Sequence, residues 1–176
     1  MADIGTFAEQ FGSGMRPTLF RVDGAIPFSD TFGGEKAFFI KSAQLPASSI
    51  GTIEVPYKGR KIKRPGDRTF AEWSLTVLQD SKGDMRADFV NWMANISGHF
   101  DTGNLSDPAQ YGEQWTITPE GANGEAITGA QITLVNCFPT DVGAVDFSYE
   151  TTDSISEFTV TIQYDYWYGG GAGENG

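Results

Sequence analysis

Apolar and polar residues alternate along most of the chain with a period of two residues. This period is typical of β-strands that bury one face. The alternating segments are residues 37–43, 52–57, 73–77, 114–118, 131–138 and 156–168. The last segment is longer than an ordinary strand and keeps apolar or aromatic side chains on one side from Phe158 to Tyr168. We therefore expect a set of mostly antiparallel strands, the last of them long and continuous.

Residues 82–97 follow a different period. Large apolar residues recur there at intervals of three and four positions: Met85, Phe89, Trp92, Met93 and Ile96. This spacing predicts a helix with one apolar face. Together the two patterns predict a mainly β fold, an antiparallel β-sandwich or barrel with one packed α-helix at about 82–97.

A hairpin is predicted around Lys58-Gly59. Ile53, Val55 and Tyr57 share one face of the preceding strand, and Pro56 indicates an edge or bulge position. The chain then returns over residues 60–63, so the turn joins two antiparallel strands. Residues 65–67, Pro-Gly-Asp, predict a second turn.

Charge is distributed unevenly along the sequence. The net charge is −11, yet every Lys and Arg lies at or before Arg86, and residues 87–176 carry only acidic charge. An acidic balance excludes a protein whose main task is to grip nucleic-acid phosphates. Six of the twelve basic residues fall on the predicted hairpin and just beyond it: Lys58, Arg60, Lys61, Lys63, Arg64 and Arg68. Two interpretations remain open, a solvated loop or a surface that docks on the acidic part of another copy.

Length and composition predict one domain, residues 1–168, followed by a flexible glycine-rich tail, residues 169–176. The first residues lack the cationic and apolar segments of a signal peptide. No apolar run approaches the ~20 residues that span a bilayer, so we expect no membrane insertion. The single cysteine excludes a disulfide within the chain.

Candidate chemical motifs are isolated. Residues 100–103 match the short signature around the catalytic aspartate of aspartic proteases, but that chemistry needs two carboxylates, so Asp101 would act only in a homodimer. Residues 171–176 match a dinucleotide-binding glycine pattern without the helix that must follow it. Cys137 lies in an apolar strand and is expected to be a buried structural thiol. His99 has no companion ligands at metal-binding spacing. We therefore expect no enzyme activity, no cofactor and no metal site.

Several blocks of sequence, taken in order, resemble the tail tube proteins of bacteriophages with contractile tails. They are residues 39–46, 50–60, 66–73, 138–140, 147–149 and 157–167. The resemblance implies a fold related to the tube protein of type VI secretion, with six copies closing into a ring and rings stacking head to tail into a hollow conduit for DNA ejection. It also implies that the hairpin reaches the neighbouring ring. The inter-ring or subunit contact candidates are then Ile53, Val55, Tyr57, Lys58, Arg60, Lys61, Lys63, Arg64 and Arg68.

The resemblance further implies partners and a place. They are other copies of the chain, a tail sheath, baseplate and tail-terminator proteins, a tape-measure protein and DNA in transit, in a virion tail assembled in the bacterial cytoplasm. An acidic conduit fits, because like charge keeps DNA from adhering to the wall. One alternative is the inner tube of an extracellular contractile injection system. Another, from a different class, is a carbohydrate-binding β-sandwich that uses Trp115 and Trp167 as an exposed platform.

Overall fold

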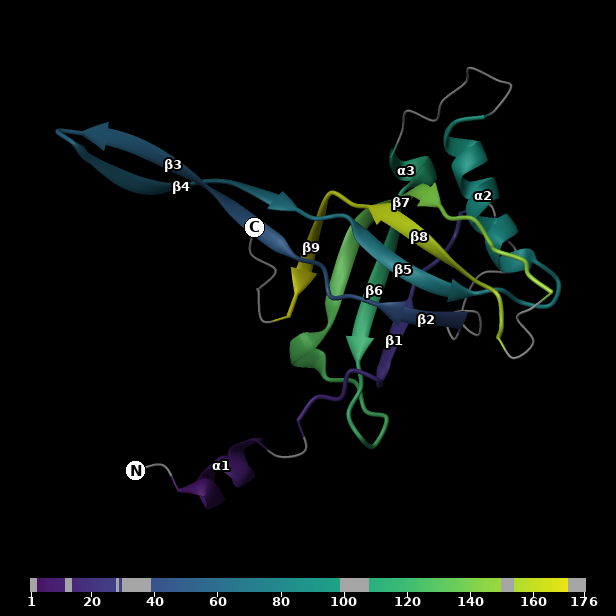
Figure 1. The fold of residues 1–176 in the computed structure, drawn as a ribbon, viewed down its shortest axis with the longest axis horizontal. Coiled ribbons are helices and arrows are strands. Elements are labelled where there is room, and N and C mark those ends of the chain that lie inside the picture. Colours follow the sequence, from purple (N-terminus) through teal and green to yellow (C-terminus); the bar gives the residue numbers. More distant parts are fainter. Residues whose placement is uncertain are drawn as a thin grey trace.

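Two antiparallel sheets make up the described part of the chain (Figure 1). The computed structural model describes residues 3–11, 14–27, 29, 39–98, 108–149 and 154–170. The larger sheet has seven strands in the order β1-β6-β7-β8-β5-β2, with β9 paired to β7. Their bounds are β1 Phe20–Asp23, β2 Ile40–Ala43, β5 Trp73–Leu78, β6 Glu113–Pro119, β7 Ile132–Val142, β8 Glu157–Gln163 and β9 Tyr166–Gly169. The smaller sheet is the pair β3, Ser48–Tyr57, and β4, Arg60–Phe70.

The larger sheet folds back on itself at β7. The first half of β7 pairs with β6 and β9, and its second half pairs with β8. Between the halves, Asn136 has a φ of 58°, in the left-handed region. The two halves face each other, because Trp73 of β5 and Trp115 of β6 meet edge to face with ring centroids 5.9 Å apart although their strands are not neighbours. The predicted mainly β sandwich is thus confirmed.

Helix α2, Asp84–Ile96, packs against this core as the sequence predicts. Met85, Phe89 and Trp92 are its buried residues. The Phe89 ring lies 6.3 Å from the Trp115 ring and 6.2 Å from the Phe158 ring, so the helix bridges the two halves of the sandwich. The backbone N–H of Met85 donates to the Asp80 carboxylate over 3.3 Å, which satisfies one of the free donors at the start of the helix.

The prediction of one continuous strand over residues 156–168 is wrong. The chain leaves the ladder at Tyr164 and Asp165 and resumes it as β9. Asp165 lies beside the bend in β7 and bonds to it. Its backbone N–H donates to the Val135 carbonyl over 3.1 Å, and its carboxylate accepts from Asn136 Nδ2 over 2.7 Å. The Tyr164 hydroxyl donates to the Ala71 carbonyl, which holds its ring inward. Alternation continues across the break, so the sequence pattern does not reveal it.

Two further α-helices and a short 3₁₀ helix, Thr128–Ala130, were not predicted. Helix α1, Ile4–Phe11, stands apart from the sandwich, and helix α3, Pro108–Tyr111, lies in a segment that the sequence analysis left without regular structure (Figure 1). The Trp92 indole N–H donates to the Tyr111 carbonyl, so α3 is tied to α2. No helix among the described residues is long and apolar enough to cross a membrane. The expected C-terminal tail lies mostly outside the described residues, although Gly169 still pairs with Ile132.

Candidate interface on the β3–β4 hairpin

The strands β3 and β4 form a long arm that leaves the body of the molecule (Figure 1). Every residue of β3 is exposed, and so is every residue of β4 except Gly66 and Phe70, which are half-buried. Strands of this length extend about 34 Å at ~3.4 Å per residue. The arm therefore presents both of its surfaces to its surroundings.

The tip of the arm is a two-residue turn, as predicted. Lys58 has a φ of 44° and Gly59 a φ of 80°. Two successive positive φ angles are typical of a type I′ turn, whose twist matches that of the flanking strands. The turn fixes the register, and Tyr57 pairs with Arg60 beside it.

The prediction of a second turn at Pro65-Gly66-Asp67 is wrong. Ile50 pairs with Arg68 and Thr52 pairs with Pro65, so Gly66 and Asp67 together lie opposite Gly51. This arrangement is a β-bulge inside a continuing strand. A Cβ atom at Gly66 would lie 3.2 Å from the Gly51 carbonyl oxygen, so glycine here permits a close approach of the two backbones.

One surface of the arm, here called the apolar face, gathers apolar side chains between two arginines. Ile53 pairs with Arg64, Val55 with Ile62, and Tyr57 with Arg60, and directly paired residues share a face. The apolar members are between 48% and 62% exposed. Ile62 was not among the sequence candidates, although its position between Arg60 and Arg64 on the same face could have revealed it. The structure brings predicted candidates together here, with Arg60 and Arg64 at the rim.

The opposite surface, here called the polar face, carries Lys61 and Lys63 near the tip. Lys63 pairs with Glu54 and Lys61 with Pro56. Lys61 Nζ also lies 2.6 Å from Glu54 Oε2, an exposed pair of the kind that contributes less than about 1 kcal/mol. Lys58, in the turn, has its Nζ 5.4 Å from the centre of the Tyr57 ring, so this cation lies beside the apolar face. Arg68 lies beyond the bulge, near the root of the arm. The candidate cations are therefore divided between two faces rather than forming one patch.

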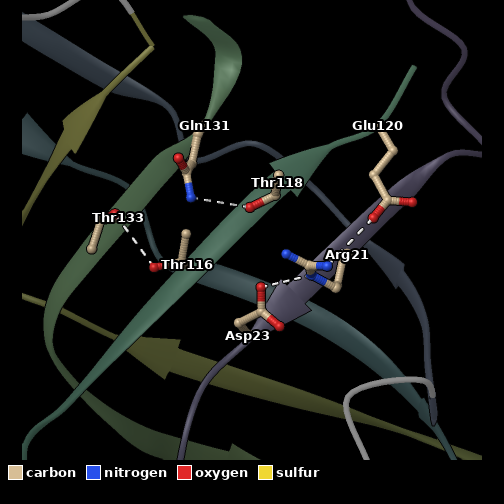
Figure 2. A network of polar contacts seen from close by, with 7 residues as sticks. All are labelled: Arg21, Asp23, Thr116, Thr118, Glu120, Gln131 and Thr133. Carbon is tan, nitrogen blue, oxygen red and sulfur yellow. Dashed lines mark hydrogen bonds and ion pairs between the residues drawn. The ribbon is translucent and has the colours of Figure 1, made fainter. Parts of the chain in front are cut away.

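Polar side chains of β1, β6 and β7, among them the buried Thr118, contact one another (Figure 2). The Arg21 guanidinium lies 2.9 Å from an Asp23 carboxylate oxygen and 3.8 Å from one of Glu120. Gln131 donates to the Thr118 hydroxyl over 3.3 Å, and the hydroxyls of Thr116 and Thr133 are 3.4 Å apart. These contacts pair the polar groups of the neighbouring strands and satisfy the hydroxyl of the buried Thr118.

The other sequence candidates have separate outcomes. His99, Asp101 and residues 171–176 lie outside the described residues. Within the described residues, no group of three or more His, Cys, Asp or Glu could hold a metal. Cys137 is buried as predicted, and burial raises the pKa of its thiol to about 12. The absence of enzyme activity stays a prediction.

The carbohydrate platform does not form. Trp115 is completely buried, and its indole N–H donates to the Ala25 carbonyl over 3.0 Å. Trp167 is half-buried, with its ring 6.5 Å from that of Phe70. The predicted platform requires both rings to be exposed, so that interpretation of Trp115 is wrong.

Comparisons with known proteins agree on one family. A family model described as phage tail tube protein matches residues 16–169. The tail tube protein gp19 of Enterobacteria phage T4 is 31% identical over 162 residues, which cover 92% of this chain and 96% of the relative, and that of Enterobacteria phage T6 is 30% identical with the same coverage. Among solved structures, the sheath-tube complex of the PVC extracellular contractile injection system contains a chain with the same fold, with a TM-score of 0.65, 18% identity, and coverage of 96% of this chain and 97% of that one. This chain belongs to the phage tail tube protein family and is a structural subunit of a phage tail tube.

Proposed function

We propose that six copies of this chain close into a ring and that rings stack head to tail into the hollow tube through which phage DNA is ejected. The observation that carries this proposal is the β3–β4 arm, whose apolar face exposes four large apolar side chains well away from the core. Exposed apolar surface on a projecting element marks an interaction site. In a member of a tube family, the neighbouring copy is the partner that is always present.

The arm favours a head-to-tail contact. The arm projects from one end of its own copy, and the surface that receives it on the next copy is a different surface. Such heterologous contacts generate a ring when the rotation from one copy to the next returns to the first copy, and an open filament when it does not. The outer strands β1 and β2 of the larger sheet supply a second kind of contact, because among the described residues each pairs with one strand only and so has an open edge. Lateral contacts between edges would close the ring, and the arm would join rings along the axis.

Sheath and baseplate proteins are the proposed outer partners. Chains with this fold occur in the PVC sheath-tube complex and in the baseplate of the anti-feeding prophage, the latter with a TM-score of 0.66 and 10% identity. The structure of the tube-terminating cap of the anti-feeding prophage also contains a chain with this fold, which supports a terminator at the end of the tube. We include a tape-measure protein, DNA in transit and assembly in the host cytoplasm in the proposal.

Purified protein should assemble without other components. We expect ring-shaped particles in negative-stain micrographs at low concentration and tubes at high concentration, because the same arm and edges are present on every copy. Light scattering across the same concentrations gives an independent measure of mass. A monodisperse monomer throughout the range would contradict the proposal.

Duplex DNA should bind the assembled protein weakly. Each copy carries a net charge of −11, so a ring repels phosphates at long range. At about 0.15 M salt we expect a dissociation constant weaker than about 1 μM by fluorescence anisotropy with labelled duplex. At low salt some binding is expected through the basic arm on dispersed rings, and it should weaken when Arg60 and Arg64 become Gln, since each lost phosphate contact lowers the affinity. Nanomolar binding at 0.15 M salt would contradict a conduit that lets DNA slide.

The inner tube of an extracellular contractile injection system is a second candidate function. The fold match to the PVC tube favours it. The phage relatives are more similar in sequence, at 30–31% identity against 18%. The contents of native particles separate the two candidates: nuclease-sensitive DNA in the tube supports a phage tail, and a protein cargo supports an injection device.

A further inference from the structure

Helix α1 is a second amphipathic element that stands outside the core. Ile4, Phe7 and Phe11 lie on one side of it at intervals of three and four residues, and they are 82%, 63% and 61% exposed. The rings of Phe7 and Phe11 stack with centroids 5.5 Å apart, which makes one continuous apolar stripe. The helix contains one charged residue, the acidic Glu9, and Asp3 precedes it. We define the stripe as Ile4, Phe7 and Phe11.

We propose that the stripe of α1 from one copy lies on the apolar face of the β3–β4 arm of a neighbouring copy. This inference rests on the proposed function, since it names the surface that receives the arm. Within a single copy the two elements leave the sandwich in different directions, and both keep their apolar side chains exposed (Figure 1). A contact between them is therefore one between copies.

The dimensions of the two surfaces match. The stripe runs from Ile4 to Phe11, about 10 Å at ~1.5 Å per residue. The apolar face runs from Ile53 to Tyr57, about 14 Å at ~3.4 Å per residue. Two strands lie about 4.8 Å apart, and a helix is about 10 Å wide with its side chains. One helix of this length therefore covers one face of the arm.

The charges of the two surfaces are complementary. The apolar face is bordered by Arg60 and Arg64, which pair across the strands with Tyr57 and Ile53. The segment from Asp3 to Phe11 carries only acidic charge. Asp3 directly precedes Ile4 at the start of the stripe, whereas Glu9, two residues from both Phe7 and Phe11, lies on the other side of the helix. Opposite charges around an apolar centre steer encounter and fix orientation. A second arm placed on the apolar face would instead bring arginines against arginines, which the charge pattern disfavours.

Cysteine pairs across copies test this contact. The native Cys137 is completely buried and its pKa is raised to about 12, so it supplies no thiolate near pH 8. A tagged Phe7→Cys copy and an untagged Val55→Cys copy are assembled together, oxidised mildly and separated without reductant. We expect the tagged–untagged heterodimer as the main linked product. The matched control uses Glu54→Cys in place of Val55→Cys, because Glu54 is the neighbouring residue but lies on the polar face. This control should give at least tenfold less heterodimer.

A substitution supplies the second measurement. Phe7→Ser with Phe11→Ser removes most of the stripe without touching the core, so the melting temperature should stay unchanged while mean tube length falls at least tenfold. Thr6→Ser, on the same helix outside the stripe, should leave tube length unchanged.

The outcomes separate this contact from the proposed function. If the wild type forms tubes, the Phe7→Cys and Val55→Cys copies fail to link, and the Phe7→Ser, Phe11→Ser variant keeps its tube length, the helix contact alone is overturned. Dominant links between two Val55→Cys copies would show that two arms face each other. Links from Val55→Cys to Phe147→Cys or Leu45→Cys would show that another exposed apolar site lies on the arm. Each of these results would overturn the helix contact. Absence of rings and tubes from the wild type would overturn both.

Discussion

Exchanging Arg60 and Arg64 for glutamate should stop tube growth while leaving the melting temperature of the isolated subunit unchanged. Both side chains are exposed on the arm and border its apolar face, so the folded core does not depend on them. An exposed pair contributes roughly 0.5 kcal/mol. If one pair per subunit is lost, six copies at a ring junction lose about 3 kcal/mol, or roughly a hundredfold in association constant. Charge reversal adds repulsion to this loss.

The other face of the arm supplies the control. Lys61→Glu with Lys63→Glu makes the same change in net charge at neighbouring positions, but on the polar face. We expect near wild-type tube lengths by electron microscopy for this variant and short or absent tubes for the arginine variant. Equal effects would show that overall charge governs assembly and that the faces do not differ. Added salt should shorten wild-type tubes only partly, because Ile53, Val55, Tyr57 and Ile62 contribute a salt-insensitive part.

Replacing Gly24 by alanine should destabilise the subunit by about 3 kcal/mol, at the upper end for overpacking. A Cβ atom at this position would lie 2.3 Å from Cδ2 of Trp115 and 2.6 Å from its Cε2. The indole cannot move aside. It is completely buried, it donates to the Ala25 carbonyl, and the rings of Trp73 and Trp92 lie 5.9 Å and 6.5 Å from it.

Gly129→Ala is the matched control for this substitution. A Cβ atom at Gly129 meets nothing within 4 Å. Chemical denaturation followed by tryptophan fluorescence should show a lower midpoint for Gly24→Ala and an unchanged or slightly higher midpoint for Gly129→Ala, since alanine reduces the freedom of the unfolded chain. An unchanged midpoint for Gly24→Ala would mean that the β1 end moves away from Trp115 at little cost.

The parts of the fold that the sequence predicted are those in which local pattern and burial agree. In β5, Trp73, Leu75 and Val77 alternate with polar residues and all three are buried. In α2, the apolar spacing and the buried side of the helix coincide at Met85, Phe89 and Trp92. The turn at Lys58-Gly59 was predictable because few sequences tolerate two successive positive φ angles.

The features that the sequence missed depend on distant partners. The break between β8 and β9 follows the bend in β7, and alternation alone does not register a bend. Pro-Gly-Asp ordinarily marks a turn, but Gly51 on the opposite strand turns it into a bulge. Trp115 looked available for ligand stacking because a strand pattern gives two faces without saying which is buried. Tertiary packing decides each of these cases.

The candidate interface was only partly predictable for the same reason. The sequence located the arm and its cations, but treated the basic residues as one cluster. Cross-strand register divides them, with Arg60 and Arg64 on one face and Lys61 and Lys63 on the other. Strand alternation also places Ile62 on the same face as Arg60 and Arg64. Helix α1, in contrast, is too short for its apolar spacing to distinguish it from a loop.

The bulge near the root of the arm has a consequence for the geometry of a stack. It inserts one additional residue in β4 without disturbing the pairs from Thr52–Pro65 to Tyr57–Arg60. The residues near the tip therefore supply the contacting side chains, and the bulge separately sets the direction of the arm. A bulge bends its strand and increases the local twist. In a tube built through this arm, its direction would set the rotation of each ring relative to the next. Loss of Gly66 alone would then change the helical twist of the tube while every contacting side chain stayed the same.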